Sequence, residues 1–154
     1  MTTSDGEVLL VSSSGGVLLD LLALRSWWER LDRRWLVVDA PDTRDALVGE
    51  VVEHAPELSP TSIADLVGAV RRSWVRLGGD DVSLVMTAGS GVAVPVFIAA
   101  RMRGIPCLWL ETRNVLTGPG LAARLGMALS TAVVVQHRRL LARHRRAVFV
   151  GELY

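Results

Sequence analysis

Residues 82–111 read VSLVMTAGSGVAVPVFIAARMRGIPCLWLE, and this stretch decides the fold class. The apolar run 82–87 predicts a strand, a Gly/Ser turn follows it, and residues 92–103 predict a helix. Gly104 predicts the end of that helix, and residues 105–111 predict a second strand. A strand, a helix and a second strand in this order are typical of a parallel sheet that is covered by helices.

The same alternation recurs on both sides of this stretch. Further strands are predicted at residues 7–12, 34–38, 49–54, 131–136 and 147–150. Further helices are predicted at residues 17–32, 62–77, 119–129 and 137–145. The pattern therefore predicts a single Rossmann-like α/β domain over residues 1–154, with a mostly parallel sheet and helices on both of its faces.

Composition limits the class of protein. The chain has 154 residues and is 50% apolar, which is enough for one globular domain with a sizeable core. Its single cysteine, Cys107, excludes an internal disulfide framework and a cysteine-based metal site. The three histidines, His54, His137 and His144, lack the close spacing of metal ligands, so we expect neither a metal nor a cofactor.

Hydropathy and charge bear on localisation. The longest uninterrupted apolar run, residues 92–100, is far below the roughly 20 residues that span a bilayer. Residues 1–7 carry no basic segment before an apolar stretch, so we expect a cytoplasmic protein without a signal peptide. The net charge of +1 combines 8 arginines against 14 acidic residues in residues 1–100 with 9 arginines against 2 acidic residues in residues 101–154. The positive charge is therefore C-terminal.

Five arginines gather near the C-terminal end. They are Arg138, Arg139, Arg143, Arg145 and Arg146. Such a cluster suits an anionic lipid surface or an acidic partner. Nucleic acid is not expected, because only two aromatic residues lie among or after these arginines and no recognition module is present.

Three predicted loops follow strands, at the edge where doubly wound folds bind ligands. The first, SSSGG at residues 12–16, offers backbone amides, hydroxyls and a helix N-terminus to a phosphate. It matches neither a dinucleotide fingerprint nor a P-loop, and a tight turn that requires glycine explains it equally well. The second loop, TAGSG at residues 87–91, repeats this chemistry, and two such loops in one sheet favour a shared ligand crevice.

The third loop begins at Glu111, a carboxylate at the tip of an apolar strand, and contains Arg113. We interpret Glu111 as a candidate catalytic residue; the alternative is an exposed Glu–Arg pair of little energetic value. The candidate phosphate-binding residues of the three loops are Ser13, Ser14, Gly15, Gly16, Gly89, Ser90, Gly91, Glu111 and Arg113.

The helix predicted at residues 17–32 carries more apolar surface than one core face needs. Its predicted core stripe is Val17, Leu21, Leu24, Trp28 and Leu31. The side chains predicted to face a membrane surface or a partner are Leu18, Leu19, Leu22 and Trp27. Burial under a neighbouring helix or loop is the alternative for this second set.

Taken in order, these segments resemble a known protein family. They are SSSGG, the whole of residues 87–111, TGPGLAARLG at 117–126, VVVQ at 133–136 and VGELY at 150–154. The family is that of the anchoring subunits of split UDP-GlcNAc transferases, which make dolichol-linked chitobiose, together with bacterial capsule and exopolysaccharide counterparts of the PssD type. The match spans nearly the whole chain, and its most specific part is residues 87–111.

This resemblance implies the N-terminal half of a GT-B glycosyltransferase that binds a polyprenyl-diphosphate-linked sugar acceptor at the inner face of the cell membrane. A separate catalytic partner would supply most of the UDP-sugar site, and GlcNAc from UDP-GlcNAc is the default transfer. The resemblance places Ser13 to Gly16 near the acceptor diphosphate, Gly89 and Gly91 in the second loop of the cleft, and Glu111 with Arg113 at the cleft rim. The residues implied to contact the partner are Gly151, Glu152, Leu153 and Tyr154.

Two departures from the family pattern limit what can be transferred. Family members usually have His after the paired glycines, where this chain has Val17, so a proton-transfer role at that position is not carried over. The eukaryotic members begin with a membrane helix that is not found here, so we expect any membrane contact to be peripheral. The competing hypothesis is a stand-alone Rossmann-like module that binds a nucleotide or phosphate ligand and has no transferase activity.

Overall fold

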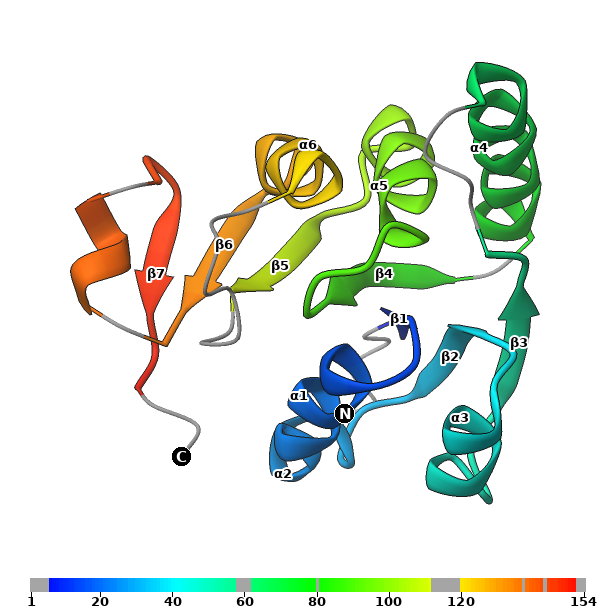
Figure 1. Ribbon diagram of the computed structural model, residues 1–154, viewed down its shortest axis with the longest axis horizontal. Coiled ribbons are helices and arrows are strands. Elements are labelled where there is room, and N and C mark those ends of the chain that lie inside the picture. Colours follow the sequence, from blue (N-terminus) through cyan, green and yellow to red (C-terminus); the bar gives the residue numbers. More distant parts are fainter. Residues whose placement is uncertain are drawn as a thin grey trace.

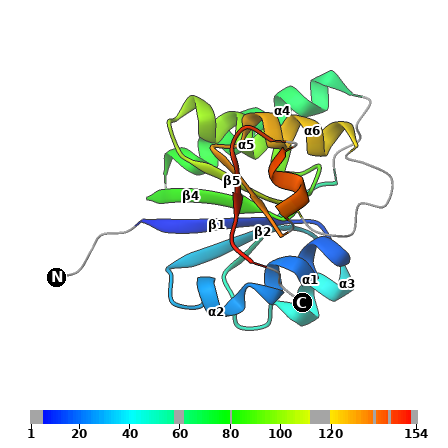
Figure 2. The same ribbon diagram turned by 90° about the vertical axis from the view of Figure 1, so that its left-hand side faces the viewer.

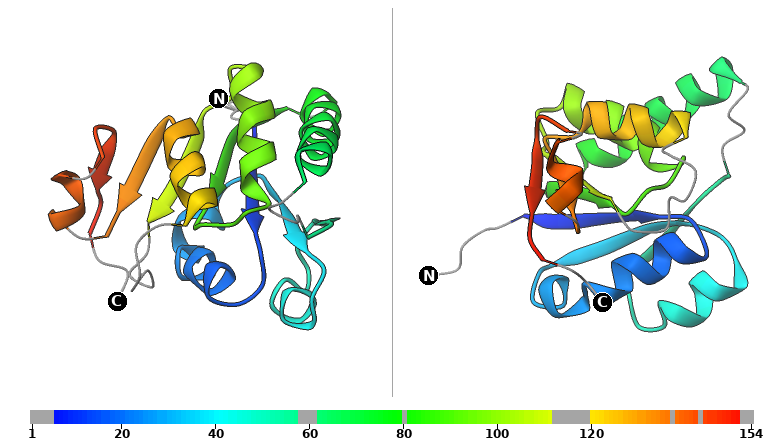
Figure 3. Two further views of the ribbon diagram at one scale, coloured as in Figure 1. Left: turned by 45° about the horizontal axis from the view of Figure 1, so that its top comes forward. Right: turned by 60° about the vertical axis from the view of Figure 1, so that its left-hand side comes forward.

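A seven-stranded sheet forms the centre of the computed structural model, which describes residues 6–57, 62–79, 81–111, 120–136, 138–142 and 144–151. The strands are β1 (Glu7–Ser12), β2 (Arg33–Val38), β3 (Val52–Ala55), β4 (Val82–Thr87), β5 (Cys107–Glu111), β6 (Ala132–Val135) and β7 (Ala147–Phe149). Their order is β3-β2-β1-β4-β5-β6-β7, and every pair is parallel (Figure 3). The prediction of a Rossmann-like α/β fold is confirmed.

Helices cover both faces of this sheet (Figures 1 and 2). They are α1 (Gly16–Ala23), α2 (Arg25–Trp28), α3 (Pro41–Ala46), α4 (Ile63–Gly78), α5 (Ala93–Met102) and α6 (Leu121–Leu129), with a 3-10 helix η1 (Arg138–Ala142) before β7. Helices α1 to α3 lie on one face, and α4 to α6 lie on the other. The chain changes face after β3, so the strand order reverses between β1 and β4.

Each face of the sheet has its own apolar core. On the α4–α6 face, Phe97 packs edge-on against Trp109 with ring centroids 6.1 Å apart. Gly126 of α6 lies against the same indole, because a Cβ at this position would overlap the Trp109 ring. On the other face, Trp28 packs edge-on against Trp35 at 5.4 Å. These contacts fix both helical layers against the sheet.

The helix predicted at residues 17–32 is wrong in its length, because the chain breaks at Leu24 and forms α1 and α2 instead. The break is stabilised by Trp28, whose indole N–H donates to the Leu21 carbonyl at 2.7 Å. The Leu21 carbonyl also accepts from the Leu24 N–H at 3.1 Å, so the indole adds a second hydrogen bond at the end of α1.

Other element boundaries differ from the prediction at the edges of the sheet. Strand β3 occupies Val52–Ala55 rather than residues 49–54, and the helix predicted at 137–145 is reduced to the five residues of η1. Helix α3 had not been predicted. It begins at Pro41, and the Thr43 hydroxyl accepts from the Ala40 N–H while it donates to the Val38 carbonyl.

The start of α4 was predicted correctly. The Ser62 hydroxyl accepts a hydrogen bond from the Asp65 N–H at 3.2 Å, as the sequence of the helix start indicated. Helix α4 runs beside α5 on its face of the sheet (Figure 1) and carries Arg71, Arg72 and Arg76.

Candidate functional site

The first two loops lie at neighbouring strand ends, where the strand order reverses. The register pairs Val11 of β1 with Thr87 of β4, so residues 12–16 and 88–92 leave the same edge of the sheet side by side. Ligands of doubly wound folds bind at this point of reversal. The topology therefore favours the predicted shared crevice.

The first loop already holds a carboxylate from its own chain. The Gly15 N–H donates to Asp42 Oδ2 of α3 at 2.7 Å, and Gly15 has a φ of +76°, which favours glycine. The Ser12 hydroxyl donates to the Ser13 carbonyl at 2.7 Å. The N–H groups of the first turn of α1 precede the first intrahelical bond, from Leu19 N–H to the Gly15 carbonyl, and can still face a ligand.

The second loop is mostly closed on itself. The Thr87 hydroxyl accepts from the Gly89 N–H, and the Ser90 hydroxyl accepts from the Val92 N–H, each at 3.3 Å. Ser90 is buried, so its side chain shapes the loop rather than facing solvent. Gly89, with a φ of +112°, and the exposed Gly91 keep the loop narrow between β4 and α5. Backbone groups are therefore what this loop can offer to a ligand.

Glu111 does not form an exposed strand tip. It is 8% exposed, and its Oε2 lies 2.9 Å from Nε2 of His144, which precedes β7. The alternative was an exposed pair of Glu111 with Arg113, but Glu111 is buried. Arg113 lies outside the described residues. The sequence could not reveal the Glu111–His144 contact, since 33 residues separate the two. The role of Glu111 as a catalytic candidate stays a prediction.

A second polar side chain is buried at the same edge. Gln136 follows β6 and is 2% exposed, and its side-chain nitrogen has no hydrogen-bond partner in the structure. It lies one residue beyond Val135, the partner of Glu111 in the strand register. The ends of β5 and β6 are therefore polar as well as buried.

The basic residues near the C-terminal end are dispersed over several contacts. Arg138 lies over the Phe149 ring at 5.3 Å, and Arg146 donates to the Ser130 carbonyl at 3.0 Å. Arg145 and Arg146 join Arg124 of α6 around an open pocket of about 470 Å³. Arg143 lies outside the described residues.

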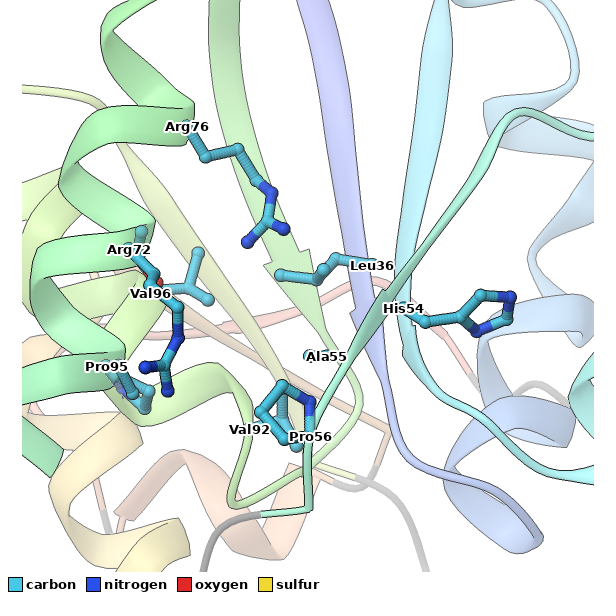
Figure 4. Close-up of a pocket in the computed structure, with 11 residues that line it drawn as sticks. Leu36, His54, Ala55, Pro56, Arg72, Arg76, Val92, Pro95 and Val96 are labelled. Carbon is cyan, nitrogen blue, oxygen red and sulfur yellow. The ribbon is translucent and has the colours of Figure 1, made fainter. Parts of the chain in front are cut away.

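Another pocket, which we call the α4 pocket, lies between α4, the end of β3 and the start of α5 (Figure 4). Its volume is about 90 Å³, and Val92 brings it next to the second loop. Figure 4 shows Arg72 and Arg76 extending from α4 toward the pocket, whereas the His54 ring points away from it. This pocket had not been predicted, because its lining residues come from four separate segments, β2, the end of β3, α4 and the start of α5.

The surface assigned to a membrane is only partly exposed. Leu18 was predicted to face a membrane, and this is wrong because it is 2% exposed and packs in the core beside Leu21. Leu22 is half-buried against the same core. Leu19 and Trp27 are exposed, so they keep the predicted orientation. Among the described residues, no helix has the length and hydropathy that a membrane crossing requires.

Two other predictions concern single residues. Cys107 is buried, and its burial raises the pKa of its thiol to about 12, so it is a small apolar core residue as expected. Gly151 is half-buried with a φ of +109°, whereas Glu152, Leu153 and Tyr154 lie outside the described residues. In the part of the chain that the structure describes, no three potential metal-binding side chains of His, Cys, Asp or Glu lie together.

The sequence of this chain is similar to part of one known transferase. No protein-family model matches the chain. A UDP-N-acetylglucosamine--N-acetylmuramyl-(pentapeptide) pyrophosphoryl-undecaprenol N-acetylglucosamine transferase from Clavibacter sepedonicus is 35% identical over 85 residues, which are 55% of this chain and 20% of that protein. The chain thus spans only a fifth of the curated relative that it matches.

Solved structures extend the likeness in fold. MurG from Acinetobacter baumannii matches 94% of the chain and 45% of its own length, with a TM-score of 0.74 and 16% identity. The UDP-GlcNAc 2-epimerase from Methanocaldococcus jannaschii matches 95% of the chain and 45% of its own length, with a TM-score of 0.73 and 11% identity. At these identities the likeness shows the fold, which is that of the N-terminal half of a GT-B protein such as MurG.

Proposed function

We propose that this chain is the acceptor-binding half of a bacterial two-component glycosyltransferase. In this proposal it binds a polyprenyl-diphosphate-linked sugar, and a second GT-B half on a separate chain binds the UDP-sugar. The default reaction is transfer of GlcNAc from UDP-GlcNAc. Residues 1–154 form the single domain that contributes this half of the cleft.

The observation that carries the proposal is the sequence match to a UDP-GlcNAc transferase that acts on a lipid-linked diphosphate. The fold supports it, because the chain matches a little under half of MurG. In a two-domain transferase the reaction needs both halves, since donor and acceptor must be held in one geometry. The resemblance to split transferases supports a second half on a separate chain.

The geometry suits acceptor binding better than proton transfer. The position after the paired glycines is Val17, which has no ionisable group, so the catalytic candidate that we propose in this chain is Glu111, buried against His144. The two loops at the end of β1 and β4 present backbone amides, which can bind phosphate oxygens without ionising. We therefore assign to this chain the binding and orientation of the acceptor, with Glu111 as its candidate catalytic group.

Peripheral membrane contact belongs to the same proposal, because a lipid-linked acceptor lies at the bilayer surface. Leu19 and Trp27 are exposed on α1 and α2. On α4, Val67 and Ile63 are also exposed and lie about one and two turns before Arg71, respectively. Apolar side chains beside arginines are typical of surfaces that bind anionic membranes.

The C-terminal residues 151–154 are proposed to contact the catalytic partner. A buried tyrosine can contribute about 2 kcal/mol or more to an interface. Deleting these four residues is expected to abolish co-purification with the partner while circular dichroism shows a folded domain. Undiminished co-purification would show that the contact lies elsewhere.

Reconstitution tests the proposal as a whole. This chain and a candidate second half, sought as the product of a neighbouring reading frame, are purified separately and mixed with UDP-GlcNAc and a polyprenyl-diphosphate sugar. We expect turnover by the mixture and little or none by either protein alone. Robust transfer by this chain alone would overturn the need for a partner, and an inactive but stably associated pair would overturn the default donor or acceptor.

A further inference from the structure

The pocket that Arg124 lines, which we call the α6 pocket, lies between α6 and the turn before β7 and has a volume of about 470 Å³. Arg124 and Ala128 lie one turn apart on α6 and line it from one side. Arg145 and Arg146 line it from the turn. None of its described lining residues belongs to the loops that we assign to the acceptor. The proposed function therefore leaves the α6 pocket without a role.

The turn before β7 is fixed against α6 and β6. The Ala147 N–H donates to the His144 carbonyl at 3.1 Å, which closes the turn. The Arg146 carbonyl accepts from the Val133 N–H at 3.1 Å, and the Arg146 guanidinium donates to the carbonyl of the buried Ser130 at 3.0 Å. The side chains on this side of the pocket are therefore positioned before a ligand binds, which lowers the entropy cost of binding.

The α6 pocket carries positive charge that no carboxylate of the described chain neutralises at its surface. Arg124, Arg145 and Arg146 line it, and none of the three forms an ion pair with another described residue. The Glu111 carboxylate lies behind the lining residue His144, with its Oε2 2.9 Å from Nε2 of the imidazole. An ionised carboxylate only accepts hydrogen bonds, so Nε2 carries a proton and Nδ1 is the nitrogen left for a ligand.

The depth of the pocket is apolar, whereas its rim is basic. Val133 of β6 is 2% exposed and Met127 of α6 is 8% exposed, and both line the pocket. The arginines are exposed and lie at the opening. The volume falls within the roughly 300–1,000 Å³ of small-molecule sites. A matching ligand therefore has an apolar part and an anionic group.

We propose that the α6 pocket binds a small phosphate monoester with an apolar substituent. Such an ester carries close to two negative charges near pH 7 and three acceptor oxygens, so it suits several guanidinium groups better than a carboxylate does. Arg124 and Arg145 pair with phosphate oxygens from opposite sides, and Met127 and Val133 contact the substituent. The inference goes beyond the proposed function and does not depend on transferase activity.

Calorimetry on the full chain tests the class of ligand. The probes are phenyl phosphate, inorganic phosphate, which lacks the ring, and benzoate, which keeps the ring but has one charge. We expect saturable binding of phenyl phosphate, with each of the other two weaker by about tenfold. No saturable binding of phenyl phosphate would overturn the proposal. Equal affinity for inorganic phosphate would overturn the apolar contact, and equal affinity for benzoate would overturn the preference for a phosphate.

Arginine variants test the location. Arg124→Gln and Arg145→Gln are each expected to weaken phenyl phosphate binding by about tenfold, through loss of a charge-assisted hydrogen bond. Arg139→Gln is the control, because Arg139 is an exposed arginine of η1 that does not line the pocket. We expect it to change the affinity by less than about twofold. Equal losses in all three variants would show general electrostatic attraction and contradict the assignment.

A pair of alanine variants on α6 tests the apolar contact by filling the pocket. Ala128→Leu is expected to weaken phenyl phosphate binding by about tenfold or more, whereas Ala122→Leu, at an exposed position that does not line the pocket, should leave it unchanged. Both positions are exposed, so we expect melting temperatures near that of the wild type. Equal binding by the two variants would place the ligand elsewhere. If Ala128→Leu unfolds, Arg124→Gln decides alone.

A lipid headgroup offers the same phosphate chemistry, and vesicles separate the two sources. Sedimentation is measured with phosphatidylcholine vesicles that contain phosphatidate. We expect Arg124→Gln to change this sedimentation by less than about twofold while it weakens phenyl phosphate binding about tenfold. Loss of vesicle binding in Arg124→Gln, without phenyl phosphate binding by the wild type, would assign the pocket to a membrane lipid and overturn the soluble ligand.

Discussion

At the scale of single residues, Asp42 limits how the first loop could bind the phosphate of the proposed acceptor. Its carboxylate accepts from Gly15 at the start of α1, which is where an anionic ligand would otherwise bind. A side chain that is already negative satisfies the amide but repels a second negative charge. The loop therefore offers a helix N-terminus to a phosphate, but the Asp42 carboxylate already accepts from the Gly15 N–H and would compete with that phosphate.

Removing that charge tests whether the loop binds phosphate. In Asp42→Asn the side-chain oxygen can still accept from Gly15, but the negative charge is lost. We expect pyrophosphate to bind this loop several times more tightly, by about 0.5–1 kcal/mol, as read from NMR shifts of the Gly16 and Val17 amides. Asp45→Asn on the same helix is the control. Unchanged shifts in Asp42→Asn would mean that the loop is only a turn.

Glu50 links stability to pH through one ion pair. Its carboxylate accepts from Arg33 at 2.7 and 2.8 Å, and this hydrogen bonding holds the pKa of Glu50 below its ordinary value of 4.5. A carboxyl whose pKa is lower in the folded state stabilises the fold above the unfolded pKa and loses that effect as pH falls through the folded pKa. The loss therefore begins near pH 4.5 and grows on further acidification.

We expect Glu50→Gln to lower the urea midpoint at pH 7 and to flatten its fall between pH 5 and the acid limit. Asp39→Asn is the contrast, because Asp39 pairs with Arg44 on the open surface, where water screens the pair. Equal pH dependence in the wild type and Glu50→Gln would show that this pair does not contribute to acid sensitivity.

At the scale of elements, a strand was predicted correctly where a long run of neighbouring apolar residues specifies it. Strands β1, β4 and β5 were predicted within two residues because each is a run of apolar residues that ends at a turn. The break at Leu24 was missed, since it depends on the indole of Trp28 and not on glycine or proline. Leu18 was assigned to the wrong face because the predicted core stripe ran through Val17 and Leu21, whereas Leu18 and Leu21 are the leucines of α1 that are buried.

The candidate site was less predictable than the fold. Local composition identified the loops at residues 12–16 and 87–91, and their common edge followed from the parallel topology. The partners of Gly15 and Glu111 come from distant segments and could not be read from spacing. The α4 pocket has the same origin, because packing of β2, β3, α4 and α5 creates it.

Two helical surfaces are candidates for contact with a membrane. Leu19 and Trp27 are exposed on α1 and α2, while Ile63 and Val67 are exposed on α4 near its arginines. We expect Ile63→Ser with Val67→Ser to reduce sedimentation with anionic vesicles more than Leu19→Ser with Trp27→Ser, because only α4 adds several positive charges. Melting temperatures of both variants should stay near that of the wild type. The opposite order would assign the membrane surface to α1 and α2.

At the scale of the whole molecule, the proposed function assigns the acceptor to this chain and the donor to a second GT-B half. The chain matches 94% of its own length to 45% of MurG, and under the proposed function a second GT-B half binds the donor. The edge where β1 and β4 end presents the N–H groups of the first turn of α1, and Arg72 and Arg76 line the neighbouring α4 pocket. These groups suit a lipid diphosphate.

Equilibrium binding of both substrates to the isolated chain tests this division most directly. A short polyprenyl-diphosphate sugar and UDP-GlcNAc are titrated separately into the purified protein. The account predicts saturable binding of the lipid-linked sugar and no saturable binding of UDP-GlcNAc by this chain alone. Tight binding of UDP-GlcNAc without binding of the lipid-linked sugar would contradict it and would favour a stand-alone nucleotide-binding module.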